Sequence, residues 1–77
     1  MPAHSDVFLL IRGNFMWAIN RNAHRKVALT YQVVDLEDDP VLKRQSLGRG
    51  EETALGVIEA ADGQIFRYRQ VMASYEA

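Results

Sequence analysis

The chain has 77 residues, of which 48% are hydrophobic and 25% charged, with a formal net charge of −1 and no cysteine. Its length leaves room for one domain, residues 1–77, with a loose start at residues 1–5. The absence of cysteine excludes disulfides and thiolate metal sites, and the near-neutral charge gives no overall attraction to nucleic acid or an anionic membrane. No stretch approaches the ~20 apolar residues of a membrane span. We therefore expect a soluble, cytoplasmic protein.

The first predicted element is a hairpin that is apolar on both faces. Residues 7–11 and 15–19 are apolar throughout, and Gly13-Asn14 between them is a two-residue turn signal. This turn predicts the facing pairs Phe8–Ile19, Leu10–Trp17, Arg12–Phe15, Leu9–Ala18 and Ile11–Met16.

A polar, basic loop is predicted next, over residues 20–26. From Val27 to Val34 the pattern alternates with a period of two and is rich in β-formers, which predicts a half-buried strand.

A short helix is predicted over residues 40–47. Asp39 followed by Pro40 is a helix-start signal, and Gly48 is a plausible stop. The apolar residues of this segment form no single stripe. Residues 48–52 read as a loop.

The last third has two interpretations. Asp62-Gly63 is a strong turn signal, and it favours a hairpin between residues 55–60 and 65–71. The alternative is a helix over residues 51–61 that ends near Gly63. Because Gly56-Val57-Ile58 is a poor helix centre, we favour the hairpin. The predicted fold is mainly β, of the α+β class: a small antiparallel sheet or partly open barrel of about five strands with one short helix, in the order β-β-β-α-β-β.

The doubly apolar hairpin is the most informative feature for function. Its faces are covered either by a sheet that curls around it or by another chain, for which a second copy is the simplest candidate. We expect a non-enzymatic protein-binding module that associates with another protein or with itself as a homodimer. Such domains are typical of bacterial and phage accessory factors, including small inhibitors. The predicted apolar contact residues are Phe8, Leu10, Phe15 and Trp17, and the charged ones are Arg67, Arg69, Asp35, Glu37 and Asp38.

A small β-barrel that binds single-stranded nucleic acid is the alternative function. Such barrels combine a positive groove with stacking aromatic rings, and Arg67 and Arg69 alternate with Phe66 and Tyr68. The plainer interpretation is that the two arginines form a solvated face. The alternative site consists of Arg21, Arg25, Lys26, Arg67 and Arg69.

Catalysis, metals and cofactors find little support in the sequence. The acidic residues 35–39 lack the alternating ligands and central glycine of a calcium loop, and two histidines, His4 and His24, are too few for a structural zinc site. Gly48-Arg49-Gly50 lacks the lysine and hydroxyl residue of a phosphate loop. We expect no catalytic residue, no metal and no cofactor.

Overall fold

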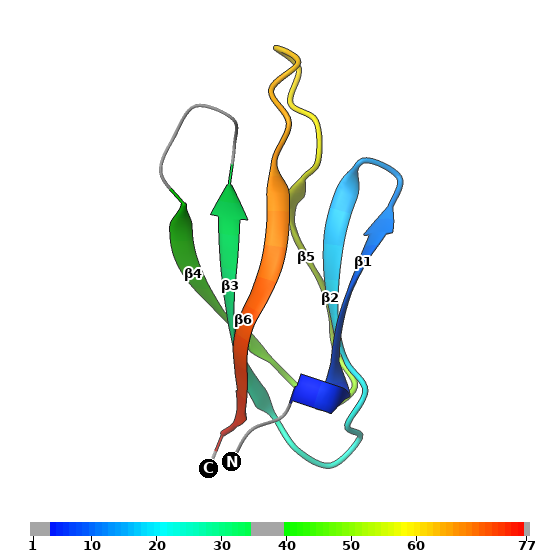
Figure 1. The fold of residues 1–77 in the computed structure, drawn as a ribbon. Coiled ribbons are helices and arrows are strands. Elements are labelled where there is room, and N and C mark those ends of the chain that lie inside the picture. The colour runs from blue at the N-terminus through cyan, green and yellow to red at the C-terminus, as the bar shows by residue number, and fades with distance from the viewer. Residues whose placement is uncertain (1–3, 35–39, 77) are drawn as a thin grey trace.

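The computed structural model describes residues 4–34 and 40–76, which form six strands, one 3-10 turn and no α-helix. The elements are η1 (His4–Asp6), β1 (Val7–Arg12), β2 (Phe15–Asn20), β3 (Val27–Val34), β4 (Val41–Leu47), β5 (Glu52–Val57) and β6 (Arg67–Tyr75). The strands run along the long axis of the molecule, and η1 lies at the same end as the last residues of β6 (Figure 1). A mainly β chain is confirmed, but with six strands where about five were predicted.

The first hairpin forms as predicted. Gly13 has a φ of 58°, and no described residue other than glycine has a positive φ. A positive φ at the first turn position alone defines a type II′ turn, for which glycine is the preferred residue. All five predicted facing pairs between β1 and β2 are confirmed.

The segment from residue 41 to residue 47 is a strand, so the predicted helix over 40–47 is wrong. β4 pairs with β3 in an antiparallel register that places Leu47 beside Val27 and Val41 beside Val33. The helix-start signal at Pro40 and the helix-stop signal at Gly48 affect only the residues next to them and do not produce a helix between them. Without an apolar stripe, a helix here would have buried little, whereas the strand adds a ladder to β3 and buries Leu47 completely. Asp39, the predicted N-cap, lies outside the described residues.

The six strands form two antiparallel sheets of three, with strand orders β1-β2-β5 and β4-β3-β6. The predicted hairpin around Gly63 exists only near its turn, where Phe66 N–H donates to the Ile58 carbonyl and Glu59 forms a bridge with Ile65. Beyond that point the two strands separate into different sheets. The strand interpretation of residues 51–61 is therefore confirmed for Glu52–Val57, and the helical one is wrong.

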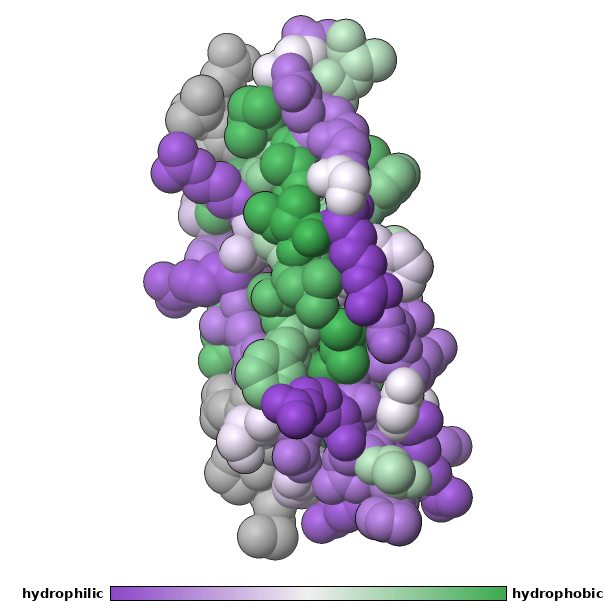
Figure 2. Space-filling model, turned by 90° about the vertical axis from the view of Figure 1, so that its right-hand side faces the viewer, coloured by the Kyte–Doolittle hydropathy of each residue, from purple (hydrophilic) through white to green (hydrophobic). Residues whose placement is uncertain are grey.

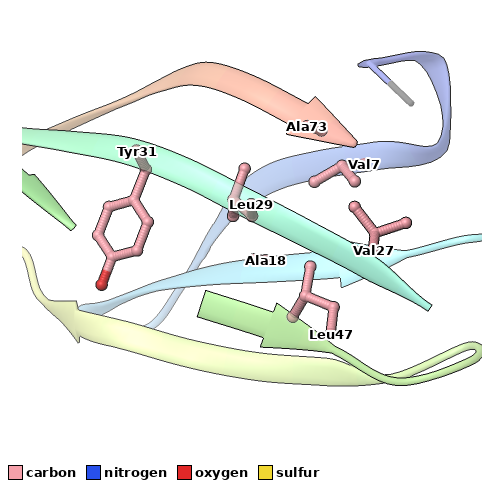
Figure 3. Packing of buried hydrophobic residues seen from close by; sticks show 7 residues of the cluster. All are labelled: Val7, Ala18, Val27, Leu29, Tyr31, Leu47 and Ala73. Atoms are coloured by element: carbon pink, nitrogen blue, oxygen red, sulfur yellow. The ribbon is translucent and has the colours of Figure 1, made fainter. Parts of the chain in front are cut away.

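The core lies between the two sheets. Its buried side chains are Val7, Ala18, Val27, Leu29, Tyr31, Leu47 and Ala73, which Figure 3 shows converging from both sheets. Two register shifts, at Met16/Trp17 against β5 and at Thr30/Tyr31 against β6, bend the strands around this core. The inward positions of β3 are the odd-numbered ones that the alternating pattern predicts.

Candidate interaction surfaces

The outer face of the β1-β2-β5 sheet carries the predicted apolar contact residues. Because Val7 and Ala18 point into the core, alternation directs Phe8, Leu10 and Trp17 outward, together with Phe15. Phe8 is 42% exposed and Phe15 44%, while Leu10 and Trp17 are half-buried. None of the described residues forms a further layer over this sheet.

Two arginines partly cover the rings of this face. The Arg12 guanidinium lies 5.2 Å from the centre of the Trp17 ring and forms a 2.5 Å ion pair with Glu52, so the contact spans all three strands. The Arg21 guanidinium lies 4.8 Å from the centre of the Phe8 ring. Cations over aromatic faces are favourable while leaving the charge hydrated. Sequence reasoning missed this role of Arg12 and Glu52, because the two residues are 40 positions apart.

An apolar stripe runs along the side of the molecule on which β1 lies, between two hydrophilic flanks (Figure 2). β1 and β6 are edge strands of different sheets, and within the described residues each pairs with a single neighbour. The exposed large apolar side chains of β1 are Phe8 and Ile11, and those of β6 are Val71 and Met72. Ile11 is 62% exposed. The free edge of β1 is therefore both apolar and accessible.

The charged candidates occupy two separate places. Arg67 and Arg69 are exposed on β6, opposite Val34 and Gln32 of β3. Arg21, Arg25 and Lys26 are exposed in the loop that precedes β3. Gln32 lies six positions after Lys26, which corresponds to roughly 20 Å along the strand. The structure does not bring these five residues together into one continuous face. Asp35, Glu37 and Asp38 lie outside the described residues.

Asn20 anchors the basic loop. It was predicted to lie in this loop, but it ends β2 and is completely buried. Its amide nitrogen donates to the carbonyls of Arg25 and Gly48, both at 2.9 Å, and its oxygen accepts from Asn22 N–H at 2.9 Å. Burying these groups is tolerated because each has a partner. One side chain thus holds the 21–26 loop against the turn at residues 48–51.

Asp6 and Tyr75 join the first element to the last strand. The Tyr75 hydroxyl donates to the Asp6 carboxylate, which also accepts from the Asn22 side chain at 3.1 Å. The hydrogen bond from Tyr75 is the largest cause that lowers the pKa of Asp6 below 3.8, followed by the bond from Asn22. The same bond raises the pKa of Tyr75, because the carboxylate favours the protonated hydroxyl. Arg25 adds a cation 4.0 Å from the centre of the Tyr75 ring.

The described part of the chain carries neither a metal-binding cluster nor a membrane-spanning helix. It holds no group of three or more His, Asp or Glu side chains placed to bind a metal. Residues 4–34 and 40–76 also contain no helix that is long and apolar enough to cross a bilayer. Comparison with protein-family models, curated proteins and solved structures finds no match for this chain.

Proposed function

We propose that this chain is a non-enzymatic protein-association module that pairs with a second copy of itself through the free edge of β1. The observation that carries the proposal is that β1 is an accessible edge strand with apolar side chains on both of its faces. Exposed apolar edges usually mark pairing sites, since monomeric proteins protect their edges.

The β1 edge lacks the usual protective devices. Its sequence, VFLLIR, contains no proline or lysine, and its one charge is at the end. The register shift in this sheet falls between β2 and β5 and leaves the β1–β2 ladder regular. A regular edge of six residues can extend the ladder into a neighbouring chain.

Backbone geometry defines how a second copy would add. In a hairpin closed by a two-residue turn, the residues that flank the turn exchange hydrogen bonds, and bonded pairs then alternate along the ladder. Arg12, Leu10 and Phe8 therefore bond β2. The backbone groups of Val7, Leu9 and Ile11 face the free edge, where they are available to a partner strand.

A two-fold axis at Leu9 fits the two faces of β1. Antiparallel partners share a face, so only residues of equal parity can pair across the axis. With Leu9 on the axis, Leu10 would lie opposite Phe8 of the partner subunit and Ile11 opposite Val7 of the partner subunit. The six-stranded sheet would join the two outer apolar faces.

The small core gives a reason for association. Only seven hydrophobic residues are buried among those described, and the chain has no disulfide. Domains of this length bury a small fraction of their surface and commonly need a further source of stability. A second copy on the β1 edge would supply additional burial.

The test is absolute mass by light scattering over a wide concentration range. We expect the wild-type chain to reach twice its mass of 8.7 kDa. Ile11→Lys should raise the dissociation constant at least tenfold, because lysine on an edge strand opposes pairing. Leu42→Lys is the matched control, since Leu42 is also 62% exposed but lies on β4. A wild-type chain that stays monomeric at millimolar concentration, or equal effects of both variants, would refute the proposal.

A further inference from the structure

We infer that a basic pocket at the end of the molecule, beside the loop 21–26, binds a phosphate group. The pocket has a volume of about 370 Å³ and is lined by His24, Arg25, Lys26, Arg49 and Glu76. This site is separate from the β1 edge, so it does not depend on self-association.

The pocket is assembled from three segments that are distant in the sequence. Asn20 ties the basic loop to the turn that carries Arg49, through its bonds to the Arg25 and Gly48 carbonyls. The Gly50 N–H donates to the Asn22 carbonyl at 3.0 Å and reinforces the same junction. The Glu76 N–H donates to the Lys26 carbonyl at 2.9 Å, which brings the end of the chain to the rim. These bonds fix the backbone positions of the charged side chains.

The pocket concentrates positive charge, although the net charge of the chain is close to zero. Arg25, Lys26 and Arg49 face a single carboxylate, Glu76, whereas the whole chain carries a net charge of −1. The one ion pair among the described residues joins Arg12 to Glu52, so no ion pair within that part of the chain neutralises the pocket cations. Like charges that line one pocket repel each other, and a bound anion would relieve that repulsion.

Two of the lining side chains are oriented by their neighbours. The Arg25 guanidinium is held over the Tyr75 ring at 4.0 Å. Glu76 accepts a hydrogen bond from the Ser46 hydroxyl at 3.0 Å, which holds the carboxylate at the Ser46 side. Lys26 and Arg49 are exposed and can turn toward a ligand.

The three cationic side chains of the pocket suit a phosphate group better than they suit a ligand with a single carboxylate. Guanidinium groups bind phosphate through two parallel N–H donors, and lysine adds a mobile point charge. A doubly charged group can engage all three cations at once. The volume lies within the range of small-ligand pockets, about 300–1,000 Å³, so a group attached to the phosphate could also enter. Glu76 would then accept a hydrogen bond from a hydroxyl or amino group of the attached part of the ligand. Such a phosphate could belong to a free nucleotide or to a nucleic acid strand.

The test is titration of the full chain at low salt with inorganic phosphate, adenosine monophosphate and a single-stranded oligonucleotide. Binding is measured by calorimetry and by the shifts of the backbone NMR signals. We expect saturable binding of adenosine monophosphate, with shifts concentrated in residues 22–26 and 48–50. Arg49→Gln and Lys26→Gln should each weaken binding about tenfold. Arg67→Gln, which removes the same charge from β6, should change the affinity less than twofold.

The outcomes separate the sources of the phosphate. Tight oligonucleotide binding with a steep salt dependence would support a nucleic acid strand, and equal affinity for nucleotide and oligonucleotide would support a small ligand. No saturable binding of any probe, or equal weakening by Arg67→Gln and Arg49→Gln, would overturn the inference. The Ile11→Lys variant, which is expected to self-associate more weakly, should bind phosphate as the wild type does, which keeps this test independent of self-association.

Discussion

The hydroxyl of Tyr68 lies in the space that a β-carbon on Gly56 would occupy. Tyr68 comes from β6, and its hydroxyl donates at 2.8 Å to the carbonyl of Val57 on β5. The contact therefore links the two sheets close to the point where β5 and β6 separate. The Tyr68 ring also packs against Tyr31, with ring centres 6.3 Å apart.

Gly56→Ala should destabilise the protein by about 1–3 kcal/mol, the usual cost of overpacking a filled site. The new methyl group would force the Tyr68 hydroxyl away from its hydrogen bond. Urea denaturation of a double-mutant cycle with Tyr68→Phe checks this expectation. In the phenylalanine background the cost of Gly56→Ala should fall, and an unchanged cost would show that the hydroxyl is not the obstacle.

Asn20→Ala should reduce the free energy of unfolding by roughly 2–4 kcal/mol, because it empties a completely buried position and leaves the partly buried Arg25 and Gly48 carbonyls without their donor. Asn14→Ala is the control. Asn14 also exchanges two hydrogen bonds with the backbone, at 2.7 and 2.9 Å to Glu59, but these bonds are exposed and water can replace them. The control should lose less than about 1 kcal/mol by chemical denaturation. Equal losses in the two variants would contradict the anchoring role of Asn20.

The Asp6–Tyr75 contact predicts a stability loss in acid. Because the pKa of Asp6 is lowered in the folded state, its contribution is complete above the ordinary value of 3.8 and is lost as the pH falls through the folded pKa. The stability difference between wild type and Asp6→Asn should therefore shrink between pH 5 and pH 2. Urea titrations at several pH values measure this difference. A constant difference across that range would argue that the Asp6 carboxylate is not coupled to folding.

Arg12→Gln should expose the Trp17 ring to solvent. Trp17 is the only tryptophan, so its fluorescence reports on this face alone. Quenching by acrylamide should increase, while stability should change by less than about 1 kcal/mol, since the Arg12–Glu52 pair is exposed. Arg69→Gln, on the other sheet, should leave the quenching unchanged. Unaltered quenching in Arg12→Gln would mean that the guanidinium does not shield the ring.

Local patterns predicted the elements whose structure is decided locally. Gly13 determines the type II′ turn, and the turn alone sets the register of the hairpin. The alternation from Val27 to Val34 likewise reports directly which side of the strand is buried.

The rest depends on contacts between distant residues. Strand β4 owes its conformation to pairing with β3, because Val41 and Leu42 remain 50% and 62% exposed and contribute little burial of their own. The Asp62-Gly63 turn fixes only its immediate neighbours and cannot indicate that the strands beyond it join different sheets. The basic pocket requires Arg49 to lie near Lys26. The buried side chain that brings them together, Asn20, lies in a polar stretch of the sequence, where burial is not expected.

The uneven placement of the core has a consequence for motion. Fully buried residues such as Leu47 and Ala73 pair with Val27 and Leu29 near the end that Asn20 closes, whereas the turns at Gly13 and Gly63 lie at the opposite end (Figure 1). Local opening should therefore begin at the Gly13 turn, which is far from Asn20 and takes no part in the Tyr68–Val57 hydrogen bond between the sheets, so that amide protons exchange fastest there. The β1 strand would then be held at the Asn20 end and be most mobile at its other end, next to the Gly13 turn.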